Sequence, residues 1–364
     1  MAGPRDIELV LITGAGASRN LGAGGTRLPL MGDWSNSLFT LMLNHVGFIE
    51  VLGLEQNLAP EEFESRLGRF LHEVQAFKAI GRLAEISVKF PHIPEQAKSL
   101  NLLKDWHQQT NHQLDQITDV LNDSLYDSFA NGAYDVAAAN RAYAGLLNVL
   151  GITPQHHMVC ATTNYDPILE VALRESGWRT YWGEPPSAGV GSDSKLDVSG
   201  MLDTMPGFTP VLHLHGRVGW YRRDGDVYCA RTSKHSKEYG VPVVMYPDLK
   251  KSYEDDPVIA TMWSQFEQAL QRAKRVFVLG HSLHDPKLVA TIATSLDDFE
   301  RLAVSTYAPP EQTAVAREAA SYVEKVVSEQ LGNARRIPMV FGTDPQAGHE
   351  MISAWLGQTR PKFG

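Results

Sequence analysis

Six short apolar runs constrain the fold of this chain more than any other feature, and segments of helical spacing separate most of them. The runs are IELVLIT (7–13), HMVCAT (157–162), VLHLHG (211–216), RVFVLG (275–280), RLAVSTY (301–307) and IPMVFG (337–342). Continuous apolar runs of this length are typical of strands buried on both faces. Their alternation with helices predicts an α/β fold, a Rossmann-like parallel sheet with helices on both faces.

More than a hundred residues without a convincing strand lie between the first run and the second. Within this gap, EEFESRLGRFLHEVQAF (61–77) and the apolar positions between 102 and 125 recur at roughly helical spacing. We therefore predict one domain over residues 1–364 with a large helical insertion after the first strand, at 35–150. A loop rich in Gly, Pro, Ser and Asp, from about 183 to 209, has the composition of a mobile flap over a site.

The composition argues against several classes of protein. With 33 Lys and Arg against 42 Asp and Glu, the formal net charge is −9, which argues against direct nucleic-acid binding. Two cysteines, Cys160 and Cys229, are too few for a disulfide framework or a four-cysteine zinc site. The N-terminal segment lacks the pattern of a signal peptide, and no apolar stretch approaches membrane-spanning length. We therefore expect a cytoplasmic protein that does not enter a membrane.

The first predicted strand ends in a glycine-rich turn, LVLITGAGASRNLG, with Gly14 and Gly16 where the strand should meet a helix. Glycines there let a backbone approach a pyrophosphate, and the helix N-terminus would offer free N–H groups. Arg19 would add a charged contact to phosphate. An ordinary tight turn explains a lone G-x-G equally well. In the dehydrogenase fingerprint, a third glycine stands where this chain has Arg19. The fingerprint also has an acidic residue after the second strand; Asp33 is at about that distance but lies in the loop-like LPLMGDW. A hydride-transferring dehydrogenase is therefore disfavoured.

Polar residues also follow three further predicted strands. ATTNYD (161–166) places an amide, a phenol and a carboxylate where a bland turn would have Gly or Pro. His215 and Gly216 end the third run, and Gly280-His281-Ser282 ends the fourth. The carboxyl ends of parallel strands meet at one edge of a sheet, where open α/β sheets bind ligands. We therefore expect these residues and the glycine turn to converge on one crevice.

Two histidines in VLHLHG, His213 and His215, would share one face of a strand, and this leaves two interpretations open. Two neutral imidazoles can bind a metal ion, with Asp166, His281 or His284 as a further ligand. Alternatively, one histidine packs in the core while His215, at the strand end, faces a ligand.

In this order, GAGAS, TTNYD, LHLHG and LGHSLHD resemble four elements of the sirtuin-like superfamily: its glycine-rich NAD loop, Thr-x-Asn-x-Asp, His-Gly and Gly-x-Ser. The resemblance runs from Gly14 to about Asp285, and LPLMGDW loosely resembles the segment after the glycine loop. It implies that Asn164 and His215 are the catalytic pair and that Asp166 supports the nicotinamide ribose or its pocket. With Arg19 and Asp33 added, the predicted NAD-binding residues are Gly14, Ala15, Gly16, Ser18, Gly280 and Ser282.

Departures from the deacetylating sirtuins narrow the expected activity. Those enzymes carry a four-cysteine zinc module after the His-Gly element, whereas that interval here holds only Cys229, so we expect no zinc and no protein deacetylation. The chain looks more like bacterial sirtuin-like effectors of antiphage defence, which hydrolyse NAD, and Tyr165 is in line with that branch. This implies an NAD+ glycohydrolase (NADase) that releases nicotinamide and ADP-ribose or a cyclised form. The alternatives are a non-catalytic NAD or ADP-ribose sensor and a metal-dependent hydrolase using His213 and His215.

An NADase has to be inactive until it is needed, because continuous loss of NAD would harm the cell. The sequence has no obvious second sensor domain, so we expect control through assembly. The expected partners are further copies of the chain, as a homo-oligomer, or a separately encoded partner such as a hexameric motor ATPase. The helical insertion at 35–150 is the expected contact surface; helices that only cover the sheet are the alternative.

Overall fold

The protein is described here from a computed structural model, which describes residues 6–25, 27, 31–42, 53, 55, 58, 60–88, 94–129, 134–183, 194–203, 207–229, 240–245, 253–306, 314–339, 341–342 and 349–359. At its centre is a seven-stranded sheet in the order β11-β10-β9-β1-β2-β5-β3, with every neighbouring pair parallel. The strands are β1 (Leu9–Thr13), β2 (Met158–Thr162), β3 (Thr180–Tyr181), β5 (Thr209–His213), β9 (Val276–Leu279), β10 (Leu302–Thr306) and β11 (Arg335–Pro338).

The strand order places a topological switch point between β1 and β9. From β1 the chain adds β2 and β5 on one side, then returns to the other side for β9, β10 and β11. In open α/β sheets the ligand site lies beyond the carboxyl ends of the strands at such a point. The glycine turn after β1 and the Gly280 segment after β9 both begin there.

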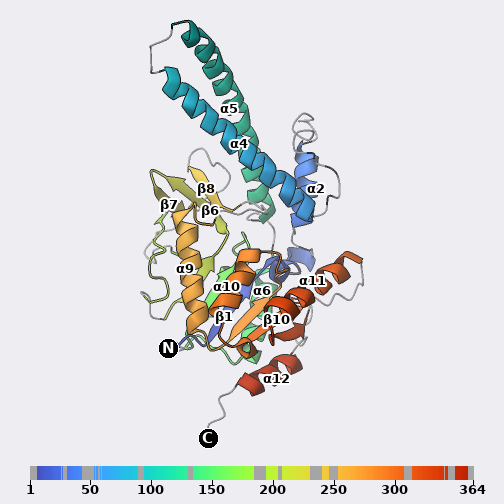
Figure 1. The fold of residues 1–364 in the computed structure, drawn as a ribbon. Coiled ribbons are helices and arrows are strands. Elements are labelled where there is room, and N and C mark those ends of the chain that lie inside the picture. The colour runs from blue at the N-terminus through green and yellow to red at the C-terminus, as the bar shows by residue number, and fades with distance from the viewer. Residues whose placement is uncertain are drawn as a thin grey trace.

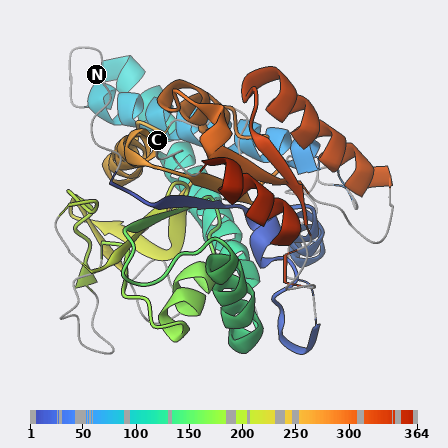
Figure 2. The ribbon, with the colours of Figure 1, turned by 90° about the horizontal axis from the view of Figure 1, so that it is seen from below.

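Helices cover both faces of the sheet, which confirms the predicted Rossmann-like α/β fold (Figure 2). On one face lie α6 (Val136–Val149) and α7 (Ile168–Glu175). On the other lie α9 (Pro257–Arg272), α10 (Pro286–Ser295) and α11 (Ala314–Gln330), and α12 (His349–Thr359) packs beside α6 and β11. Among the helices of the described part, none is long and apolar enough to cross a membrane.

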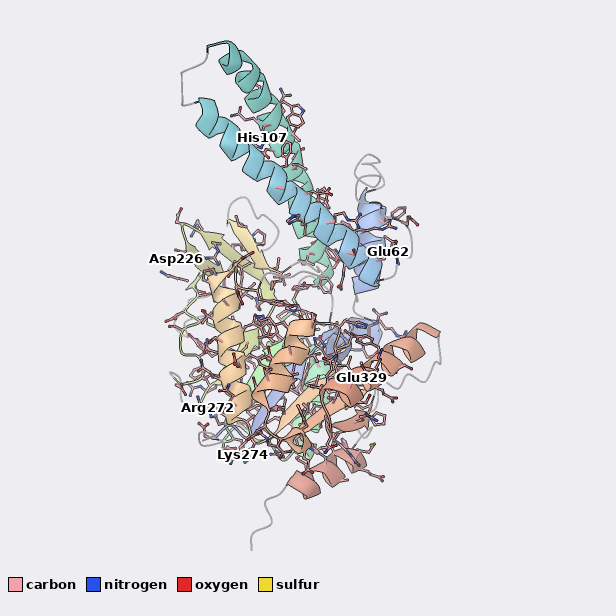
Figure 3. The ribbon with its side chains drawn as sticks, viewed as in Figure 1. Glu62, His107, Asp226, Arg272, Lys274 and Glu329 are labelled. Carbon is pink, nitrogen blue, oxygen red and sulfur yellow. The ribbon has the colours of Figure 1, made fainter. Side chains whose placement is uncertain are left out.

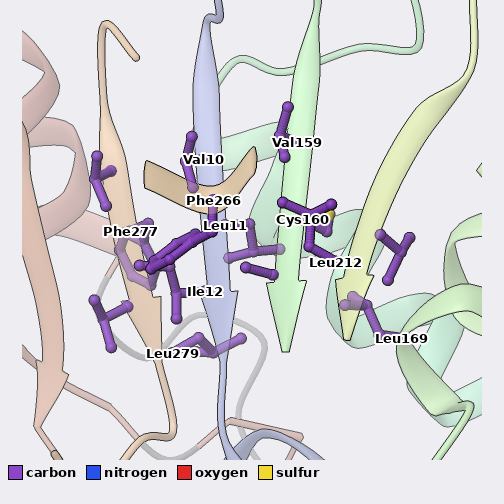
Figure 4. Packing of buried hydrophobic residues seen from close by; sticks show 14 of the residues in the cluster. Val10, Leu11, Ile12, Val159, Cys160, Leu169, Leu212, Phe266, Phe277 and Leu279 are labelled. Carbon is purple, nitrogen blue, oxygen red and sulfur yellow. The ribbon is translucent and has the colours of Figure 1, made fainter. Parts of the chain in front are cut away.

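The main core forms where the strands' side chains meet these helices. Val10, Leu11 and Ile12 of β1 are fully buried and lie between Val159 of β2 and Phe277 of β9 (Figure 4). A central parallel strand is covered on both faces, which explains why these strands read as unbroken apolar runs. The apolar runs therefore located six strands of the sheet, although the last begins at Arg335 rather than at residue 337.

A helical hairpin of α4 (Pro60–Val88) and α5 (Pro94–Phe129) projects from the body, with α2 (Met31–Met42) at its base (Figure 1). It has a hydrophobic core of its own, in which Trp34 packs edge-on against Phe63 at 5.3 Å between ring centroids. By contrast α6, which also lies within 35–150, contributes Tyr143 to the main core. The described part of that range thus packs in two places, and the boundaries of the insertion stay a prediction.

A small antiparallel sheet in the order β4-β7-β6-β8 was not predicted. Its strands are β4 (Ser194–Lys195), β6 (Gly216–Arg223), β7 (Asp226–Cys229) and β8 (Val241–Val244). Asp224 and Gly225, both with positive φ, form the two-residue turn between β6 and β7, and Asp-Gly is a strong sequence signal for such a hairpin. β4 lies inside the predicted flap, of which residues 184–193 and 204–206 are outside the described ranges.

The amino ends of the strands face away from the hairpin and carry exposed ion pairs. Arg272 bridges Asp6 and Asp203, and Lys274 pairs with Glu8, at the end of the molecule opposite His107 on the hairpin (Figure 3). Solvent-exposed pairs of this kind add little stability. Buried polar side chains with specific partners gather instead beyond the carboxyl ends.

Candidate functional site

Asn164 and His215 follow neighbouring strands at matching positions. Thr162 of β2 pairs with His213 of β5, and each of the two site residues comes two positions later. Strands in a sheet lie about 4.8 Å apart, so the register brings the two residues to the same edge. Both are buried, Asn164 at 8% exposure and His215 at 6%.

The histidine strand is shorter than predicted. β5 ends at His213, and a new strand begins at Gly216, where φ is +76° and a Cβ atom would lie 2.1 Å from the Val243 carbonyl oxygen. The chain turns between these two points, so the expectation that His213 and His215 share one strand face is wrong. Only a glycine fits both the turn and the close approach of β8.

The glycine turn after β1 packs directly on the start of the loop after β9. Gly16 N–H donates to the Gly280 carbonyl at 2.8 Å, and a Cβ atom on Gly14 or Gly16 would lie 2.7–2.8 Å from atoms of residues 280 and 281. The approach of this second loop alone thus explains both glycines. The expected helix after the turn is only α1 (Ala15–Ser18), a single turn that is too short for the predicted N-terminal phosphate site.

Ser18 joins the glycine turn to the polar segment after β2. Its hydroxyl accepts from Asn164 Nδ2 at 3.0 Å and donates to Asp166 Oδ1 at 3.3 Å. Asn164 Nδ2 also donates to the Gly14 carbonyl at 3.1 Å, and because a carbonyl only accepts, this contact fixes which end of the amide is nitrogen. Three residues predicted separately are therefore linked in one network at the ends of β1 and β2.

Asp166 carries a perturbed carboxyl group at this edge. Burial raises its pKa to about 6, although its Oδ1 accepts hydrogen bonds from Ile168 N–H and Ser18 that act in the opposite direction. The negative charge of Glu170 also raises this pKa. Buried groups with strongly shifted pKa values are concentrated at functional sites.

His215 is held by a residue that the sequence analysis did not select. Its Nε2 lies 2.7 Å from Asp285 Oδ2, and the Tyr253 hydroxyl donates to the same oxygen at 2.6 Å. Asp285 Oδ1 caps α10 by accepting from the N–H groups of Lys287 and Leu288. The sequence signal was present in LGHSLHDP, where Asp before Pro marks a helix start, but it does not reveal the histidine.

His213 is fully buried and belongs to a different cluster. Its Nε2 lies 3.0 Å from Glu170 Oε1, which also accepts from Arg217 Nε at 3.0 Å. Burial alone would raise the pKa of Glu170, but the charges of His213 and Arg217 outweigh it and lower this pKa to about 2. His213 and His215 therefore face different carboxylates and do not point at a common ion.

A family model of the SIR2-like domain matches residues 159–330, from β2 to the end of α11. This part of the chain is sirtuin-like. The matched segment contains Asn164, Asp166, His215 and Asp285, and SIR2-like domains are NAD-dependent enzymes. No curated protein matches the chain significantly.

The other residues predicted to bind NAD are distributed unevenly. Ala15 and Ser282 are exposed at the ends of β1 and β9, and Arg19 directly follows α1. Asp33 lies in the first turn of α2, so the prediction of a loop at this point is wrong. That helix belongs to the hairpin cluster through Trp34.

The two remaining metal-ligand candidates are engaged separately. His281 Nδ1 accepts from Leu283 N–H at 2.9 Å, and the His284 ring stacks on Tyr322 at 3.8 Å. Within the described ranges, no group of three or more His, Cys, Asp or Glu side chains is arranged to hold a metal ion. Cys160 and Cys229 are both buried, and burial raises the pKa of the Cys160 thiol.

Proposed function

We propose that this protein is an NAD+ glycohydrolase that cleaves NAD to nicotinamide and ADP-ribose. The network of Ser18, Asn164 and Asp166 carries the proposal, because it joins the glycine turn to a polar pair beside the switch point of a SIR2-like sheet. His215 completes the set from the next strand. An amide can orient water, an imidazole can accept a proton, and a carboxylate can stabilise positive charge. The cleavage of a cationic glycoside uses these three functions.

The residues that would hold NAD are those at the carboxyl ends of β1 and β9. The turn of Gly14 to Ser18 and the Gly280 segment present backbone rather than bulky side chains, and Ala15 and Ser282 are exposed there. Arg19, at the end of α1, would supply a cation for the pyrophosphate. The short α1 leaves this role to loop backbone and Arg19 rather than to a helix dipole.

Nicotinamide leaves NAD from a cationic ring, so the reaction needs little help from a general acid. The enzyme has to hold the ribose, stabilise positive charge on it and admit water. His215 would accept a proton from water or from a ribose hydroxyl. Asn164 Nδ2 donates to Gly14 and Ser18, and no donor among the described residues bonds Asn164 Oδ1. This oxygen would orient the ribose or the water. Asp166, ionised above about pH 6, would place a negative charge beside the developing positive charge.

The metal-dependent alternative fits the geometry less well. A metal pair on His213 and His215 would require the His213 imidazole to leave Glu170 inside the core, where its side chain is fully buried. In place of a four-cysteine zinc module after the His-Gly element, this chain has the small antiparallel sheet with one cysteine, Cys229. Protein deacetylation is accordingly not part of the proposal.

The direct test is to incubate the purified protein with NAD and to quantify nicotinamide and ADP-ribose by chromatography. Asn164→Ala and His215→Ala should each lower turnover by about a hundredfold to ten-thousandfold. Asn140→Ala and His156→Ala are matched controls, since Asn140 bonds Ser176 between α6 and α7 and His156 precedes β2 at the opposite edge. Wild-type turnover in both site variants would refute the assignment. Tight NAD binding without turnover under any condition would favour a non-catalytic sensor.

The biological role proposed is that of a regulated, NAD-depleting effector of bacterial antiphage defence. Control would come from self-association or from a separately encoded partner such as a hexameric motor ATPase, with the α4–α5 hairpin as contact surface. The hairpin's separate core and the 54% exposed Trp106 on α5 support this choice. Light scattering, with and without the partner, should find an oligomer whose low NADase activity rises on assembly. A monomer that turns over NAD at full rate alone would contradict this.

A further inference from the structure

His215 is held in one orientation by a carboxylate from a distant part of the chain, and this carboxylate is held by a phenol. We infer that Asp285 is a positioning residue that fixes the tautomer of His215, and that Tyr253 fixes Asp285. The inference deepens the proposed function and rests on it for its catalytic meaning. Its structural half, the effect of Asp285 on the imidazole, is testable without any reaction.

All four positions around the Asp285 carboxylate have partners. Oδ1 accepts from two backbone N–H groups of α10, at 3.0 and 3.2 Å, and Oδ2 meets the Tyr253 hydroxyl at 2.6 Å and His215 Nε2 at 2.7 Å. The three side chains are each less than 9% exposed. Buried hydrogen bonds to a charged acceptor are short and strong, so this set holds the imidazole plane in place.

The carboxylate also selects where the imidazole carries its proton. An ionised carboxylate is only an acceptor, so His215 must present an N–H from Nε2. The neutral ring then has its lone pair on Nδ1, which becomes the basic atom. An Asp partner is known to hold a catalytic histidine in this way in other enzymes, where an Asn in its place gives the wrong tautomer.

The backbone just before Asp285 has two residues with positive φ. Leu283, a buried residue with a branched side chain, has a φ of +58°, and Gly280 has a φ of +61°. Left-handed conformations are costly outside glycine, and such outliers are concentrated at functional sites. His281 stabilises this one by accepting the Leu283 N–H at 2.9 Å. The loop therefore adopts a strained path between the end of β9 and the Asp285 cap.

The test is Asp285→Asn in the full chain, because Asn is also a good helix cap and leaves α10 intact. Its amide nitrogen would donate to His215 Nε2 and force the proton onto Nδ1. Two-bond 1H–15N correlation spectra of protein with 15N-labelled histidine report the tautomer. The His215 signals are identified as those lost in His215→Gln. We expect this tautomer to change, and kcat to fall by about a hundredfold to ten-thousandfold with KM nearly constant.

Asp256→Asn is the matched control, since Asp256 caps α9 in the same Asp-Pro arrangement but bonds no histidine among the described residues. It should change neither the tautomer nor kcat. If Asp285→Asn does not fold, Tyr253→Phe still tests the inference, with an expected fall in kcat of about threefold to tenfold at constant KM.

The outcomes separate this inference from the proposed function. An unchanged tautomer in Asp285→Asn, or a changed tautomer with wild-type kcat, would overturn it. An unchanged kcat in Tyr253→Phe would overturn the role of Tyr253. If no form of the protein cleaves NAD, the proposed function fails, but a tautomer change confined to Asp285→Asn would still support the positioning of His215.

Discussion

Asp166 and Glu170 are buried carboxylates, one just before α7 and one within it, and their pKa values are shifted in opposite directions. Burial raises the pKa of Asp166 to about 6, since its hydrogen-bond partners, Ser18 and the Ile168 N–H, are neutral. Burial acts on Glu170 as well, but its interactions with His213 and Arg217 outweigh burial and lower the pKa to about 2.

The difference shows which of the two charges is satisfied within the protein. Glu170 is paired with His213 and Arg217 and belongs to the packed interior. Asp166 forms no ion pair within the described residues, although the charge of Arg217 acts on it from a greater distance. In the proposed function its charge would face the positive charge of the ligand. The same contrast separates His213 from His215: the first faces the core carboxylate, and the second lies at the sheet edge beside Asp285.

The largest effect is expected when the buried pair of His213 and Glu170 is broken. His213→Leu should destabilise the fold by about 3 kcal/mol, because it removes a partner from a buried charge. His215→Leu should cost less than this, since Asp285 keeps its bonds from Tyr253 and α10. Urea unfolding of the two variants measures the difference, and equal losses would show that the two histidines are not distinct in this way.

Asp166→Asn should stabilise the protein at neutral pH while it impairs NAD cleavage. A pKa raised from 3.8 to about 6 costs the folded state about 3 kcal/mol when the group is ionised. Below pH 3.8 the carboxyl is neutral in both the folded and unfolded states, so the gain should vanish there, grow between pH 3.8 and about 6, and stay constant above. Thermal melts at pH 4 and 7.5 give the answer; a variant less stable than wild type at pH 7.5 would contradict the assigned burial cost.

The pH dependence of turnover tests the same carboxylate. If ionised Asp166 stabilises the transition state, kcat should fall about tenfold per pH unit, or 1.4 kcal/mol, as the pH drops below about 6. Glu170 should not contribute, because its lowered pKa keeps it ionised down to about pH 2. In Asp166→Asn this fall in kcat at low pH should disappear. If it persists in that variant, another group is responsible for it.

The smallest expected effect concerns Tyr165, which lies between the two polar site residues. Its hydroxyl donates to the Met245 carbonyl, and Met245 N–H in turn donates to the His215 carbonyl at 2.7 Å. Tyr165→Phe should cost about 1 kcal/mol of stability, the value of one hydrogen bond. Calorimetry is the appropriate measurement, and a loss beyond about 3 kcal/mol would mean that the hydroxyl holds more than this one contact.

The sheet and its polar edge were predictable because short stretches of the sequence indicate both. Each buried strand is an apolar run, and parallel pairing then brings the residues after β1, β2, β5 and β9 to one edge. The partners of the histidines were not predictable, since Asp285 lies 70 positions from His215 and Glu170 lies 43 from His213. The same-face argument failed because it assumed that the strand continued to Gly216, where only the contact with β8 reveals the turn.

An aromatic contact joins the hairpin to the polar edge. Phe129, the last residue of α5, lies edge-on to Tyr165 at 5.6 Å, and Tyr165 belongs to the hairpin's core rather than to that of the sheet. With 36 residues, α5 is about 54 Å long, so a tilt of roughly 10° about its base would carry its far end about 9 Å. Such a tilt would move Phe129 against Tyr165, the residue between Asn164 and Asp166.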